Sequence, residues 1–201
     1  MVFDVLIIGG GVAGMQCALV LGSAKNKPFA TDKKIGIVLH QKSSHLQNAL
    51  FNNVLGLKPK TLGKDLLSEG KQQLKALYPH ITQIEKEKVL SIEIFEDYFN
   101  IATNKNKYLS KTVVLALNYA KPFSIKGLDN FIEPHKKANI EKDRIQLKNN
   151  DFIVMKNLYC CGTIAGLRSQ FSIAAGSGAT VATDILTLWN NGKHTKVHDK
   201  I

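Results

Sequence analysis

Gly9, Gly11 and Gly14 have the Gly-x-Gly-x-x-Gly spacing of a turn that can hold a diphosphate. The apolar residues 2–8 before them predict a buried strand, and the residues from Val12 to about 24 predict a helix. In that context Gly9 makes the tight turn, Gly11 lets the backbone approach a diphosphate, and Gly14 lets helix and strand pack closely. Unpaired N–H groups at the helix N-terminus would attract the phosphates. The motif therefore favours dinucleotide binding over a glycine-rich turn with no ligand.

The second strand, predicted at 35–39, is not followed by the acidic residue that binds ribose hydroxyls in many such sites. His40, Gln41 and Lys42 stand there instead. His40 or Gln41 could hydrogen-bond a ribose, whereas Lys42 could meet the additional phosphate of NADP. An exposed loop without a ligand is the alternative for His40, so this position leaves the choice of dinucleotide open.

A second motif lies near the C-terminus, where an apolar strand at 157–161 runs into Gly162 and Thr163. A short loop follows, and small residues open a helix predicted at 173–189. The N-terminus of that helix is another site for an anion or a carbonyl group, because its first N–H groups lack partners. Its small residues allow a flat group to approach the backbone. A simple NAD-binding domain has no need of this second motif.

The motifs together resemble the FAD-binding half of the thioredoxin-reductase-like flavoproteins, within the pyridine nucleotide-disulphide oxidoreductases, over nearly the whole chain. Residues 4–14 resemble the opening motif of that family, and 53–56 resemble its asparagine-containing loop over the flavin. Residues 113–118 resemble its strand ending in Ala-Thr-Gly, 158–163 its strand ending in Gly-Asp, and 170–178 its segment that contacts the isoalloxazine ring. The resemblance implies FAD as the cofactor. The candidate cofactor-binding residues are Gly9, Gly11, Val12, Ala13, Gly14, His40, Gln41, Lys42, Asn53, Val89, Ala116, Leu117, Gly162, Thr163, Gln170, Phe171, Ile173 and Ala174.

Several positions depart from the family's pattern. Besides His40 in place of the acid, Asn118 replaces a glycine and Thr163 replaces the aspartate that the family uses on the ribityl chain. The chain has no redox Cys-x-x-Cys and no second Gly-x-Gly-x-x-Gly for NADPH. About forty residues separate Leu117 from Asn157, where the family inserts its NADPH domain, and forty are too few for a domain. The chain therefore resembles single-domain members that keep FAD binding alone.

The charge is strongly positive, with 27 Lys and Arg against 16 Asp and Glu and a formal net charge of +11. Only two of the basic residues are arginine, and the lysines are spread along the chain, so we expect a basic solvated surface and no nucleic-acid partner. Three cysteines without a secretory segment indicate a reducing, cytoplasmic location. We expect all three cysteines to be structural. The apolar stretch 5–22 is broken by consecutive glycines, so no membrane span is expected there, nor in any other apolar run.

The order of the predicted elements indicates an α/β fold, a Rossmann-like FAD-binding domain with a parallel central sheet and a small antiparallel meander. We expect one domain over 1–201, with the meander at about 89–111, a variable connection at about 121–156 and a polar C-terminal tail at 190–201. A helix at 62–77 should bury Leu66, Leu67, Leu74 and Leu77.

The leading hypothesis is an FAD-dependent oxidoreductase that passes electrons through the flavin. No catalytic residue is assigned; His45, in the loop at 41–61 expected to cover the flavin, is a candidate general acid whose alternative is a solvated loop histidine. Reducing equivalents would come from diffusing NAD(P)H or from a redox partner protein, and a homodimer is compatible with this class. The alternatives are an NAD(P)-binding Rossmann protein and a non-catalytic flavin-binding or redox-sensing protein.

Overall fold

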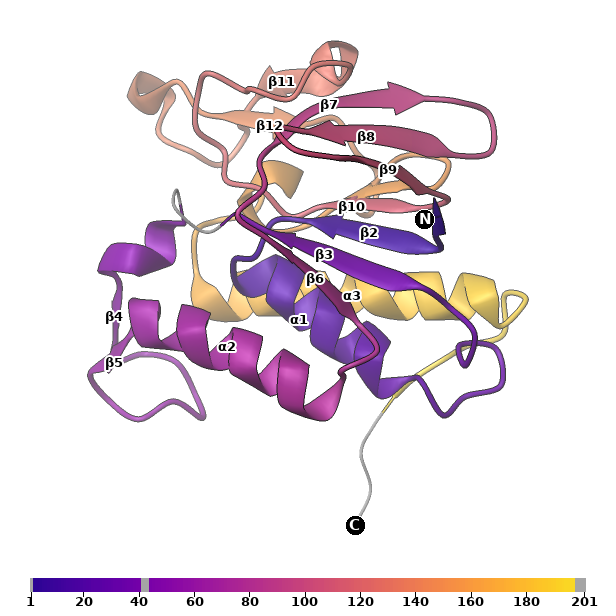
Figure 1. The fold of residues 1–201 in the computed structure, drawn as a ribbon. Helices are drawn as coiled ribbons and strands as arrows, with labels where there is room; N and C mark the ends of the chain where they lie inside the picture. The colour runs from indigo at the N-terminus through magenta and orange to yellow at the C-terminus, as the bar shows by residue number, and fades with distance from the viewer. Residues whose placement is uncertain (1, 41–43, 198–201) are drawn as a thin grey trace.

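A central sheet of six strands organises the computed structural model, which describes residues 2–40 and 44–197 (Figure 1). Five strands are parallel, and β13 pairs antiparallel with β14 at one edge. This arrangement confirms the predicted Rossmann-like α/β fold. The order across the sheet is β13 (Ile153–Met155), β14 (Leu158–Cys160), β10 (Val113–Leu115), β2 (Val5–Ile8), β3 (Ile35–Leu39) and β6 (Thr82–Glu85).

Helices cover one face of this sheet, and smaller sheets cover the other (Figure 1). The central strands are almost entirely Val, Ile and Leu and are buried throughout, as strands between two layers must be. Helix α1 (Val12–Ser23) packs against α3 (Phe171–Trp189), and α2 (Gly63–Leu77) lies beside α1. Leu67 and Leu74 of α2 are buried as predicted, whereas Leu66 is half-buried and Leu77 is 59% exposed. The expected apolar face of α2 is therefore narrower than its sequence indicates.

The first apolar segment divides between two sheets, which corrects the expected single strand at 2–8. Strand β1 (Val2–Phe3) joins the edge of a four-stranded sheet, and β2 joins the central sheet. Asp4 stands at the division, where one carboxylate oxygen accepts a hydrogen bond from the Lys34 backbone N–H at 2.9 Å. Its other oxygen pairs with the Lys111 ammonium at 3.0 Å. These two contacts hold the bend, and both come from residues distant in the sequence.

The antiparallel meander is present, and it continues the four-stranded sheet in the order β1-β9-β8-β7. Its strands are β7 (Val89–Ile94), β8 (Phe99–Thr103) and β9 (Lys107–Ser110). The connection that follows β10 is folded as well. It contains the 3₁₀ turns η2 (Asp129–Phe131) and η3 (Ile140–Lys142) and the antiparallel pair β11 (Ile132–Pro134) and β12 (Ile145–Leu147). Because Ile145 and Leu147 are buried, this connection completes the core.

Helix α3 has the length and apolarity of a membrane-crossing helix, with a mean hydropathy of 1.3. This finding corrects the expectation that no further apolar run is long enough. Val181, Ala182, Ile185 and Leu186 of α3 belong to the core cluster formed with α1 and the central sheet. These contacts bury one face of α3 against the rest of the protein.

Candidate functional site

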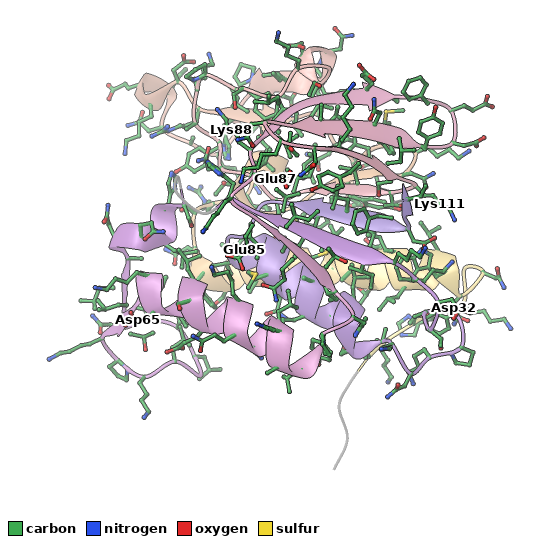
Figure 2. The ribbon with its side chains drawn as sticks, in the orientation of Figure 1. Asp32, Asp65, Glu85, Glu87, Lys88 and Lys111 are labelled. Atoms are coloured by element: carbon green, nitrogen blue, oxygen red, sulfur yellow. The ribbon has the colours of Figure 1, made fainter. Side chains whose placement is uncertain are left out.

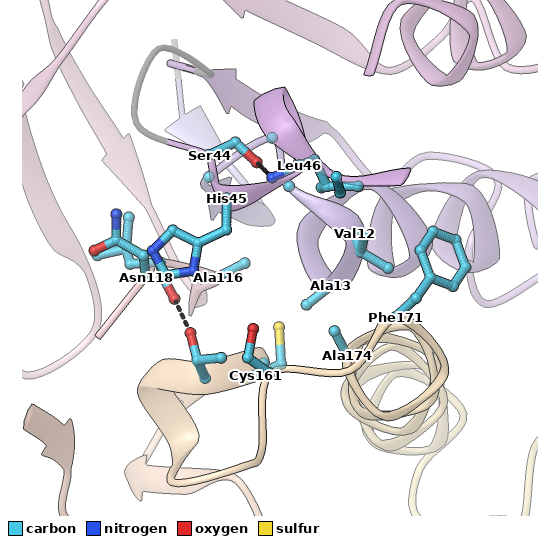
Figure 3. A pocket seen from close by; sticks show the side chains of 18 of the residues that line it. Val12, Ala13, Ser44, His45, Leu46, Ala116, Asn118, Cys161, Phe171 and Ala174 are labelled. Atoms are coloured by element: carbon cyan, nitrogen blue, oxygen red, sulfur yellow. Dashed lines mark hydrogen bonds between the residues drawn. The ribbon is translucent and has the colours of Figure 1, made fainter. Parts of the chain in front are cut away.

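A pocket of about 250 Å³ opens at the carboxyl ends of the parallel strands. The residue that follows each of four neighbouring strands lines it, namely Gly9, His40, Ala116 and Cys161. Ligands bind at this edge in open α/β sheets, because the loops and helix N-termini meet there. Figure 3 shows His45 and Asn118 at one end of the pocket and Phe171 at the other. The predicted site residues that it brings together are Gly9, Gly11, Val12, Ala13, His40, Ala116, Leu117, Gly162, Thr163, Gln170, Phe171 and Ala174.

The glycine turn shapes the floor of the pocket. Gly9 has a φ of +123°, and a Cβ added there would overlap the Ala116 carbonyl group. Gly14 does not line the pocket; a Cβ on it would overlap the Gly9 carbonyl oxygen, so Gly14 permits the close approach of helix and strand. Gly11 differs, since the nearest atom to an added Cβ is the Ser44 Oγ at 3.9 Å. The space in front of Gly11 is therefore available to a ligand.

Two helices direct unpaired N–H groups into this pocket. Helix α1 begins at Val12 after Gly11, and α3 begins at Phe171 after Gln170, and neither preceding residue caps its helix with a side-chain hydrogen bond. The first N–H groups of a helix carry partial positive charge and need acceptors. Gly162, at φ +75°, donates its N–H to the Ser177 hydroxyl of α3 at 2.9 Å, which fixes the second turn against α3.

An apolar wall stands at the α3 end of the pocket. The Phe51 and Phe171 rings lie 5.2 Å apart at an interplanar angle of 70°. Phe51 belongs to β4 (Leu50–Phe51), which pairs with β5 (Thr61–Leu62). The short helix η1 (His45–Asn48) precedes β4, and the Ser44 Oγ caps it by accepting the Leu46 N–H at 3.3 Å. Rings in this arrangement favour a flat apolar ligand.

A second hollow of about 130 Å³ shares Gly9, His40, Leu117 and Asn118 with the first pocket. Val89 lines this second hollow, together with Val38 and Lys88. The two hollows share one wall. A ligand with two separate bulky ends could therefore occupy both.

Glu87 anchors the wall that Lys88 and Val89 provide (Figure 2). Its carboxylate is buried and accepts hydrogen bonds from the Thr103 hydroxyl at 2.6 Å, the Asn106 amide at 2.7 Å and the Tyr108 hydroxyl at 3.0 Å. Burial by itself raises the pKa of Glu87, but these hydrogen bonds outweigh it and hold the pKa below its ordinary value. Glu87 is therefore a charged carboxylate that ties the β8–β9 turn to the second hollow.

Some predicted residues lie elsewhere. Asn53 is exposed, Ile173 is 40% exposed, and neither lines either hollow. Gln41 and Lys42 lie outside the described residues. Sequence reasoning missed other lining residues, because they come from the irregular segment after β3 and from the loop before α3: Ser44, Leu46, Ala49, Phe51 and Ser169. The apolar Leu46 and Phe51 in this segment were the available signal.

Burial disfavours the charged forms of His45 and of the three cysteine thiols. Burial lowers the pKa of His45, and the positive charge of Arg144 lowers it further, so the imidazole is neutral near neutral pH. Cys17, Cys160 and Cys161 are buried thiols in the structure. Burial raises the pKa of Cys160 to about 12 and raises that of Cys17 and Cys161 as well. Within 2–40 and 44–197, no group of three His, Cys, Asp or Glu residues is arranged to hold a metal ion.

A family model for the pyridine nucleotide-disulphide oxidoreductases matches residues 3–168. The chain belongs to that family. Its members are FAD-binding flavoproteins, so FAD is the cofactor that the family brings to this fold. The family model covers both the glycine turn at Gly9 and the second turn at Gly162.

Relatives within the family are longer than this chain. The chain is 31% identical over 124 residues to ferredoxin–NADP reductase 1 of Bacillus pumilus, which covers 60% of this chain and 34% of the relative. It is 29% identical over 132 residues to a ferredoxin–NADP reductase of Streptococcus agalactiae, covering 64% of this chain and 39% of the relative. The chain thus spans little more than a third of these curated relatives.

Solved structures of the family share the fold. A thioredoxin reductase from Gloeobacter violaceus superimposes with a TM-score of 0.71 at 14% identity, covering 100% of this chain and 98% of the other. A ferredoxin-flavin thioredoxin reductase from Clostridium acetobutylicum gives a TM-score of 0.67 at 18% identity, covering 94% and 99%. At these identities the likeness supports the fold and leaves the function of this family member to its own residues.

Proposed function

We propose that this protein is an oxidoreductase in which FAD, held in the pocket, passes electrons between an external donor and an external acceptor. One observation carries the proposal: a single pocket receives the open glycine turn at Gly11 and the uncapped N-termini of both α1 and α3. A diphosphate needs the open glycine turn and the N-terminus of α1. The carbonyl groups of an isoalloxazine ring can use the N-terminus of α3.

The proposal assigns the two ends of FAD to the two adjoining hollows. In this arrangement the diphosphate lies before Gly11 and Ala13, and the isoalloxazine ring lies toward Phe51 and Phe171. The adenosine then extends into the second hollow beside Val89. The flavin ring supplies hydride and single-electron chemistry when bound. The protein's residues bind it, orient it and exclude water from one of its faces.

The electrons must come from outside the FAD site. No second Gly-x-Gly-x-x-Gly or Cys-x-x-Cys is present in the sequence, and the three thiols are buried with raised pKa values. A thiol that stays protonated is a poor partner for disulfide exchange. We therefore propose diffusing NAD(P)H or a redox protein as donor and acceptor. The names of the curated relatives, ferredoxin–NADP reductases, support both kinds of partner. The reduced thiols agree with a cytoplasmic location.

An NAD(P)-binding protein is the second candidate, and one observation favours it. His40 and Lys88 line the second hollow. A carboxylate there would bind the ribose of an unphosphorylated adenosine, whereas basic side chains favour a phosphorylated one, as in NADP. The wall formed by Phe51, Phe171 and the α3 N-terminus opposes it, since a nicotinamide dinucleotide alone does not need a second helix N-terminus.

Separate titrations of the purified protein with FAD and with NADPH distinguish the two candidates. A ligand that binds the native state raises the melting temperature, and at a given concentration the increase is larger for the tighter ligand. We expect FAD at micromolar concentration to raise the melting temperature, and NADPH to raise it less. A larger increase with NADPH than with FAD would favour the second candidate.

A further inference from the structure

Arg144 stacks on an aromatic side chain beside the cofactor pocket. Its guanidinium carbon lies 5.2 Å from the centre of the Tyr119 ring. The same ring contacts His45 edge-on, with centroids 5.5 Å apart, and His135 at 5.2 Å. These four side chains, which we call the Tyr119 cluster, come from η1 (His45), from the loop after β10 (Tyr119) and from the connection between β11 and β12 (His135 and Arg144). The cluster therefore gathers residues that the sequence separates by a hundred positions.

Hydrogen bonds attach the Tyr119 cluster to the pocket. The Ile145 N–H donates to the Tyr119 carbonyl at 3.1 Å, and the His135 N–H donates to the Arg144 carbonyl at 2.9 Å. The His135 Nδ1 accepts the Lys137 N–H at 3.1 Å, so its proton is on Nε2, which donates to the Thr163 carbonyl at 3.1 Å. Thr163 and His45 both line the pocket. Arg144 is thus one ring away from the pocket lining, at the end where Figure 3 shows His45 and Asn118.

The charge of Arg144 has no partner in the part of the chain that the structure describes. Its Nε is buried without a hydrogen bond, and its guanidinium forms no ion pair with a described carboxylate. The acids close to it in the β11–β12 segment are already paired, Asp143 with Lys121 at 2.6 Å and Glu133 with Lys136 at 3.0 Å. A partly buried guanidinium without an anion is unfavourable, and stacking on one ring offsets only part of that cost.

We propose that Arg144 is an anion subsite of this pocket and that its guanidinium binds a phosphate group. The planar guanidinium donates parallel N–H groups that match phosphate oxygens, and stacking on Tyr119 fixes its orientation in advance. The inference rests on the proposed function for the source of the phosphate. Its first source is the diphosphate of bound FAD, because His45 of the Tyr119 cluster lines the same pocket as the glycine turn and Arg144 lies one ring behind that lining. Its second source is a phosphate of NAD(P)H arriving as electron donor.

Equilibrium titrations of the full chain with FAD and with riboflavin, which has no phosphate, test the subsite. We expect Arg144→Gln to raise the Kd for FAD about tenfold and to leave the Kd for riboflavin unchanged. Arg144→Lys keeps the charge without the planar fork and should recover part of the affinity. Arg168→Gln is the matched control, since Arg168 is the other arginine and is exposed. It should change neither Kd.

The possible outcomes distinguish the two sources of the phosphate, and they distinguish failure of the subsite from failure of the proposed function. An unchanged Kd for FAD with a raised Kd for NADPH on the FAD-loaded Arg144→Gln variant would assign the phosphate to the electron donor. Added salt should weaken phosphate binding more in the unchanged protein than in the variant. Equal weakening of FAD and riboflavin, or no weakening of FAD or NADPH, would overturn the subsite. Failure of the unchanged protein to bind FAD would instead overturn the proposed function.

Discussion

The Ala116 carbonyl occupies the space that a side chain on Gly9 would need. Gly9 follows β2, and Ala116 follows β10, the neighbouring strand, so this contact joins the two strands where the pocket begins. Gly9 also has a φ of +123°, a conformation that other residues rarely adopt. The positive φ of Gly9 and its contact with the Ala116 carbonyl involve no ligand. Together they set the position of the glycine turn that faces the pocket.

Gly9→Ala should therefore destabilise the protein. The positive φ and the overlap with Ala116 each oppose a methyl group, and we expect a loss of more than about 2 kcal/mol in the free energy of unfolding. Urea unfolding followed by circular dichroism measures it. An unchanged unfolding midpoint would show that the turn can relax.

Gly11→Ala should separate binding from stability. Gly11 has a φ of −80°, and an added Cβ meets no atom nearer than 3.9 Å, so the fold accepts alanine. The methyl group would enter the space that we assign to the diphosphate, and we expect the Kd for FAD to rise at least tenfold (about 1.4 kcal/mol). Flavin fluorescence titration measures the Kd. Normal FAD binding by a stable Gly11→Ala variant would exclude this position for the diphosphate.

Glu87 should stabilise the protein in a pH-dependent way. Its folded pKa lies below the ordinary value of 4.5, so its contribution is fully present above that pH and is lost as the pH falls through the folded pKa. Glu87→Gln should cost about 1–3 kcal/mol near pH 7. The difference in the free energy of unfolding between the variant and the unchanged protein should shrink at a pH below 4.5, the ordinary pKa of a glutamate. Urea unfolding near pH 7 and below pH 4.5 measures this difference. A difference that stays constant between the two conditions would contradict the assignment.

The thiols should be unreactive in the native protein. Cys160, with a pKa raised to about 12, is present as the protonated thiol at pH 8, and Cys17 and Cys161 are buried as well. Iodoacetamide should therefore label none of the three until the protein is unfolded, as mass spectrometry would report. Rapid labelling of the folded protein, or a disulfide between two of these cysteines, would reopen a direct redox role for them.

The sequence predicts the elements whose signal is local. Strand β3 at Ile35–Leu39 and helix α1 from Val12 follow from a run of branched residues and from the glycine turn before the helix. The bend at Asp4 is not local, since it depends on hydrogen bonds with Lys34 and Lys111. Strand β6 (Thr82–Glu85) is also missed, because Ile84 is its one apolar residue and it lies at the sheet edge.

The candidate site divides in the same way. The glycine turn and the Gly162 turn were predictable because each motif is contiguous in the sequence. The Tyr119 cluster was not, because residues near 45, 119, 135 and 144 meet only after the β11–β12 pair has folded. Asn53 stays a prediction: the family pattern places it near the flavin, and in the structure it is exposed and lines neither hollow.

The visible absorbance spectrum of the purified full chain tests the central claim most directly. The protein should be incubated with FAD, separated from free flavin by gel filtration, and then reduced with NADPH in the absence of oxygen. We predict that FAD stays with the protein, is released intact as FAD on denaturation, and loses its visible absorbance on reduction. A protein fraction that remains colourless after incubation with FAD would contradict the account.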